Sequence, residues 1–142
     1  RGAAVDSRDS FGMTPLMLAC IMGRAEVVRL LLSRGVDPTL RDDGSWAALM
    51  WATWGAEHPG SDYVAVIRLL LEDGRAPVDA RTYDGRTALM MACSNSHTDR
   101  VRVLLLEGGA DPSIPDNEGM KPMAKARQAD HHETVRLLEV RA

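Results

Sequence analysis

A short pattern that marks the start of a helix occurs four times along the chain, and this repetition constrains the fold more than any other feature. Its copies are TPLMLAC, AALMWAT, TALMMAC and KPMAKAR, which start at Thr14, Ala47, Thr87 and Lys121. A leucine-rich pattern follows each copy, as in VVRLLLSRG from Val27 and VIRLLLEDG from Val66. Since the two patterns alternate in a fixed order, the chain is predicted to be an array of four similar units.

Each unit is predicted to contain two short helices and a turn. Thr14 and Thr87 are suited to cap the first helix, because a hydroxyl oxygen accepts hydrogen bonds from backbone N–H groups that are otherwise unpaired. Proline at the first helical position loses no hydrogen bond, as at Pro15 and Pro122. The second helix is expected to end where a glycine supplies a left-handed residue. These glycines are Gly35, Gly74 and Gly109.

The leucine-rich helix is predicted to bury one apolar side against neighbouring units. Val27, Leu30 and Leu31 follow the three-and-four spacing of an amphipathic helix. We expect Leu31, Leu70 and Leu105 to be buried. Two helices this short cannot bury their apolar sides alone, so each unit is expected to stack on the next one.

Composition and charge exclude several classes of protein. The sequence is 45% hydrophobic and 26% charged, as in globular proteins. Its net charge of -3 and its interspersed acids and bases form no basic stripe, so no nucleic-acid partner is expected. No apolar run approaches the roughly 20 residues that span a bilayer, so membrane insertion is not expected either. Cys20 and Cys93 make no disulfide framework, which favours a cytoplasmic or nuclear location.

The repeated unit resembles the ankyrin repeat. The shared motifs are G-x-TPL-x-x-A, V-x-LLL-x-x-G and AD-P, and the resemblance covers nearly the whole chain. It divides residues 1–142 into the tail of a preceding repeat and repeats 1 to 4, at residues 1–8, 9–41, 42–81, 82–115 and 116–142. The resemblance implies a single all-α domain, a solenoid of stacked helix-turn-helix units joined by extended β-turn fingers.

Several departures from the family pattern change the local expectations. Methionine or alanine replaces the family's histidine after TPL, so soft packing is expected in place of a hydrogen bond to the turn. These residues are Met17, Met50, Met90 and Ala124. Repeat 2 starts at Ala47 without a capping hydroxyl, which costs about 1 kcal/mol, and it carries an insertion between its helices around AEHPGSDY. Glu139 replaces a leucine in repeat 4, as expected of a C-terminal cap.

The sequence contains no residue pattern typical of catalysis or metal binding. A Gly-rich phosphate loop, HExxH and GxSxG are absent. His131 and His132 are adjacent and point about 100° apart on a helix, so they cannot bind one ion from a single face. Cys20 and Cys93 are expected to be buried, inert thiols, and His58 a solvated loop residue. No enzymatic activity, cofactor or metal is therefore expected.

In ankyrin repeats, the finger tips and the exposed side of the first helix form a concave face that binds partners. Transferred by register, the resemblance gives eight partner-binding candidates: Phe11, Met13, Ile21, Met22, Trp46, Trp54, Tyr83 and Arg86. Exposed aromatic side chains are typical of interface hot spots. Two alternatives stay open: Trp46 and Trp54 brace the insertion of repeat 2, and Ile21 and Met22 pack on a missing upstream repeat. Trp51 is expected to lie in the core.

The predicted function is a protein–protein interaction module, a non-catalytic adaptor or scaffold that binds a protein or peptide ligand on this concave face. The tail-like residues 1–8 favour a longer parent chain. The alternative function is a structural spacer, or an intramolecular brace that regulates another domain of the same parent chain. Fold alone does not distinguish these functions.

Overall fold

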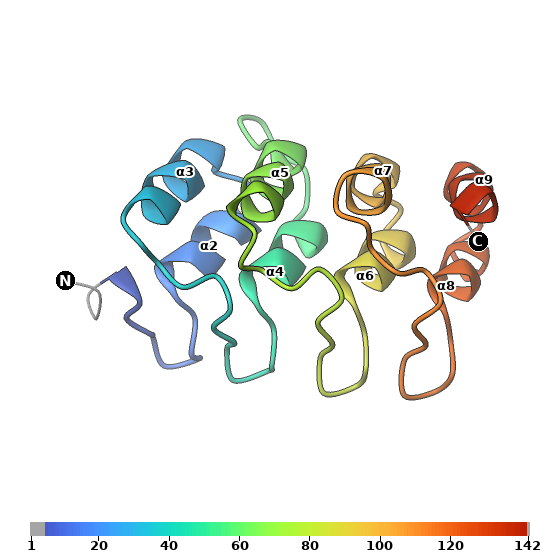
Figure 1. Cartoon of the computed structure of the whole chain (residues 1–142), viewed down its shortest axis with the longest axis horizontal. Coiled ribbons are helices and arrows are strands. Elements are labelled where there is room, and N and C mark those ends of the chain that lie inside the picture. Colours follow the sequence, from blue (N-terminus) through green and yellow to red (C-terminus); the bar gives the residue numbers. More distant parts are fainter. Residues whose placement is uncertain (1–4, 142) are drawn as a thin grey trace. The chain divides into compact units, whose positions relative to one another are not determined.

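The computed structural model describes residues 5–141, with the side chain of Arg141 excepted (Figure 1). It is all-helical, as the sequence predicts, and its helices come in pairs. Residues 1–77 and 78–142 form two compact units, and each unit contains two helix pairs. Residues 1–4 of the predicted tail and Ala142 of repeat 4 lie outside the described residues.

In the first unit, repeat 1 contributes α2 (Pro15–Ile21) and α3 (Ala25–Ser33), and repeat 2 contributes α4 (Ala48–Trp54) and α5 (Tyr63–Asp73). α2 packs against α4 and α3 packs against α5, while the two helices of each repeat also contact each other (Figure 1). Ala19 on α2 and Ala52 on α4 are buried, and these small residues allow the first helices to approach closely. The stacking covers apolar side chains that one repeat leaves open.

In the second unit, repeat 3 contributes α6 (Ala88–Ser94) and α7 (Thr98–Leu106), and repeat 4 contributes α8 (Pro122–Gln128) and α9 (His132–Arg141). α6 packs against α8 and α7 against α9, as in the first unit. The buried apolar residues include Leu89, Leu104, Leu105, Ala126 and Leu138. Within residues 5–141, none of the helices has the length and apolarity needed to cross a bilayer.

The helix starts follow the predicted caps, with one addition. Thr14 Oγ1 accepts a hydrogen bond from the Met17 N–H at 3.2 Å, whereas Ala47 provides no side-chain cap. Thr87 caps α6 in the same way as Thr14 caps α2. The prediction that methionine replaces hydrogen bonding by packing alone is wrong in α2, where the Thr14 N–H donates to Met17 Sδ at 3.5 Å. Sulfur is a weak acceptor, and it restores part of the contact that a histidine would make.

The predicted register of α3 is displaced by one residue. Leu70 and Leu105 are buried as predicted, but Leu31 is only half-buried. Val27 and Leu30 are 45% and 51% exposed, while the neighbouring Val28 is buried. The register prediction failed because consecutive apolar residues, VV and LLL, fit the three-and-four spacing in two ways.

A pair of threonines in the second unit shows which surface of a repeat the exposed side of α3 belongs to. The backbone hydrogen bonds that start α3 and α9 place Val27 and Thr134 at the same helical position. Thr134 Oγ1 lies 3.1 Å from Thr98 Oγ1 on α7, the second helix of the preceding repeat. Val27 and Leu30 therefore lie on the side of α3 that, in repeat 4, faces the preceding repeat.

Residues 5–8 make the same kinds of contact as residues 78–81. The Asp37 N–H donates to Asp6 Oδ1 at 2.9 Å, and the Asp111 N–H donates to Asp79 Oδ1 at 2.9 Å. Arg8 Nη1 donates to Arg41 O at 2.8 Å, and Arg81 Nη2 donates in the same way to Pro115 O at 2.7 Å. These contacts are consistent with the prediction that residues 1–8 are the tail of a preceding repeat, which stays a prediction.

The insertion of repeat 2 forms a strap, residues 55–62, between α4 and α5. The strap and the first residue of α5 bind three consecutive carbonyl oxygens at the end of α2. Tyr63 Oη donates to Ile21 O at 2.6 Å, His58 Nε2 lies 2.9 Å from Met22 O, and the Asp62 N–H donates to Gly23 O at 2.9 Å. His58 lies in a loop as predicted, but it is half-buried rather than fully solvated and contacts Met22 O.

Tyr63 is the main anchor of the strap. Its ring is buried, and its hydroxyl also lies 3.1 Å from Ala56 O. Gly55 makes room for the ring, because a Cβ at that position would lie 2.4 Å from Tyr63 Cε1. The strap therefore joins the two repeats of the first unit through backbone acceptors and one buried aromatic side chain.

Candidate partner-binding face

In each finger, a backbone hydrogen bond closes the turn, and the side chain of the first residue of the turn accepts further backbone hydrogen bonds. In repeat 2, the Asp42 N–H donates to Trp46 O, and Asp42 Oδ1 accepts from the N–H groups of Gly44 and Trp46, each at 2.9 Å. Asp9 in repeat 1 and Asp116 in repeat 4 close their fingers in the same way. These aspartates are therefore held by their own loops.

The first two fingers contact each other within the first unit. The Asp43 N–H donates to Phe11 O at 3.0 Å. Gly12 is required at this contact, because a Cβ there would lie 2.9 Å from the backbone nitrogen of Asp43. This hydrogen bond holds Phe11 beside the finger of repeat 2. That finger leads into α4, which carries Trp51 and Trp54.

Three tryptophans form one cluster over α4 and its finger. The ring centroids of Trp46 and Trp51 are 4.5 Å apart, and Trp54 lies 6.2 Å from Trp46 and 5.8 Å from Trp51 in edge-to-face arrangements. Trp51 Nε1 donates to Asp42 Oδ2 at 2.8 Å, so the carboxylate that closes the finger also orients this ring. Among residues 5–141, no acceptor lies within hydrogen-bonding distance of the indole nitrogens of Trp46 and Trp54.

A hollow of about 440 Å³ opens beside this cluster. We call it the aromatic hollow, and its lining residues are Phe11, Met13, Asp42, Asp43, Gly44, Trp46 and Trp51. Phe11 is 72% exposed, which is unusual for a large apolar side chain. The hollow lies entirely within the first unit and combines apolar walls with two carboxylates.

Three of the eight partner-binding candidates line the aromatic hollow, namely Phe11, Met13 and Trp46. Trp54 packs on the tryptophan cluster and stays 48% exposed. The prediction that Trp51 lies in the core is wrong, because Trp51 is half-buried and lines the hollow. Asp43 also lines the hollow and is not among the eight candidates, although the family register places it on the same exposed side of repeat 2.

Ile21 and Met22 lie at the end of α2, where the strap binds their carbonyl oxygens. The side chain of Met22 is exposed and that of Ile21 is half-buried. The alternative in which Trp46 and Trp54 brace the insertion finds no support in their ring contacts, which join the three tryptophans to one another. The strap is held instead by His58, Asp62 and Tyr63.

The remaining two candidates belong to the second unit, on the finger of repeat 3. Tyr83 is 80% exposed at its tip. Arg86 Nε donates to Asp84 Oδ2 at 3.0 Å, so the guanidinium is paired within its own finger. A hydrogen bond from Thr82 and then the charge of Arg86 lower the pKa of Asp84 below its usual value. Arg86 thus neutralises the exposed acid of this finger.

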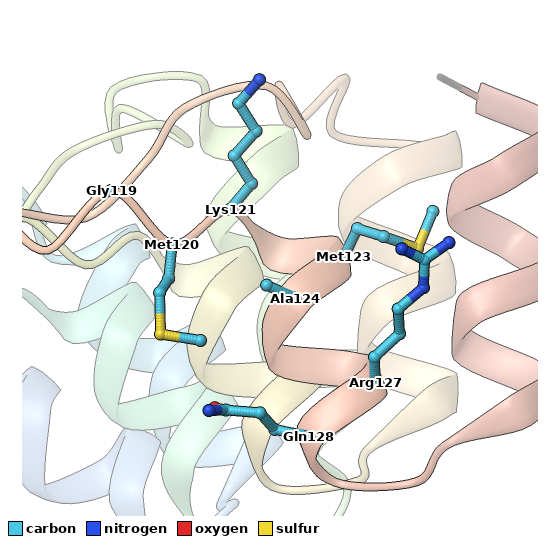
Figure 2. Close-up of a pocket in the computed structure, with 7 residues that line it drawn as sticks. All are labelled: Gly119, Met120, Lys121, Met123, Ala124, Arg127 and Gln128. Atoms are coloured by element: carbon cyan, nitrogen blue, oxygen red, sulfur yellow. The ribbon is translucent and has the colours of Figure 1, made fainter.

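A second hollow, of about 570 Å³, lies beside α8 in the second unit. We call it the methionine hollow; its lining residues are Gly119, Met120, Lys121, Met123, Ala124, Arg127 and Gln128. Figure 2 shows Met123 and Arg127 on one side of Ala124 and Met120 on the other. It differs from the aromatic hollow in carrying two cations and no aromatic ring.

Asp116, at the base of the methionine hollow's finger, forms a largely covered ion pair with α8. Lys125 Nζ lies 2.9 Å from Asp116 Oδ2, and both side chains are largely covered. The hydrogen bond from Lys125, followed by those from the Met120 and Glu118 N–H groups, lowers the pKa of Asp116 to about 2. Asp116 is therefore fixed in its charged form by its own finger and α8.

The two thiols and the histidines form no reactive group in the described structure. Burial raises the pKa of the Cys93 thiol to about 12 and raises that of Cys20 further, so neither forms a nucleophilic thiolate near neutral pH. His132 is exposed and lies near Asp130. Among residues 5–140, no group of three or more His, Cys, Asp or Glu side chains is placed to hold a metal ion.

The comparison with protein families agrees with this architecture. The family model described as "Ankyrin repeats (3 copies)" matches residues 1–82 and 56–140. The chain belongs to the ankyrin repeat family. The matched residues contain the helices, the fingers and the exposed aromatic residues described above.

Similar proteins are much longer than this chain. An ankyrin repeat and KH domain-containing protein, mask-1 of Caenorhabditis elegans, is 34% identical over 96% of the chain, which spans 5% of that protein. Human transient receptor potential cation channel subfamily A member 1 is 30% identical over 92% of the chain, which spans 11% of it. Mouse ankyrin repeat and SOCS box protein 16 is 39% identical over 82% of the chain, which spans 26% of it. The chain thus spans about a quarter or less of the length of each of these relatives.

Proposed function

We propose that this ankyrin repeat region binds a protein or peptide partner through the face that contains the aromatic hollow. The observation that carries the proposal is that exposed Phe11 and half-buried Trp46 line one hollow, and that exposed Trp54 packs on Trp46 beside it, all within one unit. Ankyrin repeats generally bind proteins. Trp and Tyr are also enriched among residues that dominate binding energy at interfaces.

Further candidates lie at the end of α2 in the first unit and on the finger of repeat 3 in the second unit. Met22 presents an exposed side chain at the end of α2, with Ile21 beside it. Tyr83 offers an exposed aromatic side chain on the finger of repeat 3, with Arg86 on the same finger. We propose that the hollow binds the partner's main anchor and that Ile21 and Met22 contribute surrounding contacts in the first unit. Tyr83 and Arg86 are candidate contacts of the second unit.

The proposed role is that of a non-catalytic adaptor or scaffold in the cytoplasm or nucleus. The chain spans from 5% to 26% of the three relatives described above, and this small share favours a region within a longer protein. The same observation favours a second candidate function, in which the partner is another domain of the same parent chain. Both functions use the same face and differ in whether the partner is supplied in cis or in trans.

Affinity capture with matched variants tests the proposal. Phe11→Ala and Trp54→Ala should each reduce the recovery of partners severalfold, because each removes an exposed anchor of the face. Val140→Ala, which truncates an exposed apolar residue on α9, is the control and should leave recovery unchanged. Thermal unfolding of each variant checks that the fold persists.

The outcome against the proposal is equally specific. If Phe11→Ala and Trp54→Ala retain wild-type capture at unchanged melting temperature, the face around the aromatic hollow is not the binding face. Supplying the remainder of the parent chain as the bait distinguishes the two candidate functions. Binding to that bait supports the intramolecular brace, and binding to separate proteins supports the adaptor.

A further inference from the structure

The exposed acid of the repeat 2 finger pairs with no cation among residues 5–140, unlike the exposed acid of the repeat 3 finger. Asp84 is paired with Arg86 at 3.0 Å. Within the described part of the chain, the Asp43 carboxylate, which lines the aromatic hollow, forms no ion pair or hydrogen bond. Asp43 therefore places an unneutralised negative charge at an apolar surface.

The two fingers share a backbone plan, which makes the comparison direct. Trp46 O accepts from the Asp42 N–H, and Arg86 O accepts from the Thr82 N–H, each at 2.9 Å. Trp46 and Arg86 thus take the same finger position. In repeat 3 that position supplies a guanidinium to the neighbouring acid, and in repeat 2 it supplies an indole ring.

The other charged groups of the two fingers of the first unit are held in contacts of their own. Asp42 accepts hydrogen bonds from two backbone N–H groups and from Trp51 Nε1. Asp9 accepts from the N–H groups of Phe11 and Met13. The two arginines nearby donate to backbone carbonyl oxygens, Arg8 to Arg41 O and Arg41 to Ser45 O. The charged residues that line the hollow itself are Asp42 and Asp43, and of these two Asp42 is buried and Asp43 is exposed.

We propose that the aromatic hollow receives an arginine side chain of the partner, with its guanidinium paired to Asp43 and lying against the rings of Trp46 and Phe11. This inference rests on the proposed function and names the chemistry of the bound segment. An arginine guanidinium is planar, stacks on aromatic rings and pairs with carboxylates through two N–H groups. It therefore matches both the rings and the unpaired acid.

The rest of the hollow fits the remainder of such a segment. Met13 offers apolar surface to the methylene stem of arginine. The indole N–H groups of Trp46 and Trp54, which have no acceptor in the described part of the chain, are available to backbone carbonyl oxygens of the partner. A lysine pairs with Asp43 as a point charge but has no plane to stack on the rings, so it should bind less well.

Nuclear magnetic resonance of the three indole N–H groups tests this inference on the whole chain. The probe is the tripeptide acetyl-Gly-Arg-Gly-amide, and its matched control contains citrulline, which has a similar shape and no charge. The arginine peptide should shift the Trp46 and Trp54 signals saturably. The citrulline peptide should bind at least ~10-fold more weakly, and the lysine peptide should be intermediate.

A pair of acid variants completes the test. Asp43→Asn should reduce arginine-peptide binding to the level of the citrulline peptide. Asp84→Asn, which alters the exposed acid already paired with Arg86, is the matched control and should leave binding unchanged. Equal binding of the arginine and citrulline peptides, or unchanged binding in Asp43→Asn, would overturn the inference.

The inference and the proposed function fail in different ways. If partner capture depends on Phe11 and Trp54 but is unaffected by Asp43→Asn, the binding face stands and the arginine anchor is rejected. If the arginine peptide binds through Asp43 while Phe11→Ala and Trp54→Ala leave capture unchanged, the hollow recognises arginine and the captured proteins bind elsewhere.

Discussion

The fingers that begin repeats 2 and 3 close in the same way and carry opposite chemistry at one position. In repeat 3, Arg86 turns back onto Asp84, and the finger neutralises its own acid. In repeat 2, Trp46 packs against Trp51 instead, and no cation of the described residues pairs with Asp43. One side chain thus separates a finger whose charges are satisfied internally from one that presents an unsatisfied acid beside aromatic rings.

The hollows of the two units extend the same contrast. The aromatic hollow combines Phe11 and two tryptophans with carboxylates. The methionine hollow combines Met120 and Met123 with the cations Lys121 and Arg127. Repeats with one backbone therefore present surfaces of different charge, because the finger and the exposed side of the first helix contribute little to the buried core and are free to vary.

The largest expected effect tests whether the two units respond separately. Leu70→Ala in the first unit and Leu105→Ala in the second each truncate a buried leucine, which should cost about 2–5 kcal/mol of unfolding free energy. Leu70→Ala should accelerate alkylation of Cys20 more than that of Cys93, and Leu105→Ala should do the reverse. Peptide mapping after timed iodoacetamide labelling measures both rates.

Leu106→Ala is the control for this pair, because Leu106 is exposed beside Leu105. It should change the unfolding free energy by less than about 0.5 kcal/mol. Equal acceleration of both thiols in either buried-leucine variant would show that the units open together and would remove the basis for treating them separately.

The next effect converts the repeat 2 finger into the repeat 3 type. Trp46→Arg places a guanidinium beside Asp43, so the finger should neutralise its own acid. Binding of the arginine tripeptide should then weaken at least ~10-fold, as followed by the Trp54 indole signal. Trp46→Phe, which keeps an aromatic ring and adds no charge, should retain most of the binding; equal losses in the two variants would contradict the charge comparison.

A smaller effect concerns the strap, which the first unit has and the second lacks between its helices. Tyr63→Phe removes the hydrogen bond to Ile21 O and should lower the unfolding free energy by about 1 kcal/mol. Tyr83→Phe is the control at a largely exposed tyrosine and should have almost no effect. Urea unfolding measures both, and a similar small change in the two variants would mean that the strap does not stabilise the first unit.

The smallest effect is a change in acid sensitivity of the second unit. The lowered pKa of Asp116 means that its contribution to stability is present above pH about 4 and is lost as the pH falls towards 2. Lys125→Met removes the main cause of that shift, so the melting temperature should fall at neutral pH, and the difference from wild type should shrink on acidification. Lys121→Met, which removes a nearby charge outside the ion pair, is the control, and a constant difference across this pH range would contradict the assignment.

The helices were predictable because their signals are local. Thr14 and Thr87 cap helices where the sequence places them, and Leu70 and Leu105 are buried as the leucine spacing indicates. The register of α3 was not predictable, since VVRLLL offers two equivalent apolar sides. Only the stacked structure shows that Val28 faces inward and Val27 outward.

The site was predictable in part, for a related reason. The exposure of Phe11 and Trp54 followed from the family register. The role of Trp51 did not, because it depends on a hydrogen bond to Asp42, nine residues earlier on a different element. The strap was visible only as extra length, since it binds backbone oxygens of another repeat and such contacts leave no side-chain pattern.

The attachment of the strap to the main chain has an evolutionary consequence. Every amino acid has a carbonyl oxygen, so replacing the side chains of Ile21 and Met22 leaves the acceptors for Tyr63 and His58 in place. These two positions can diversify, and alter what the neighbouring surface recognises, while the tether between the repeats persists unchanged.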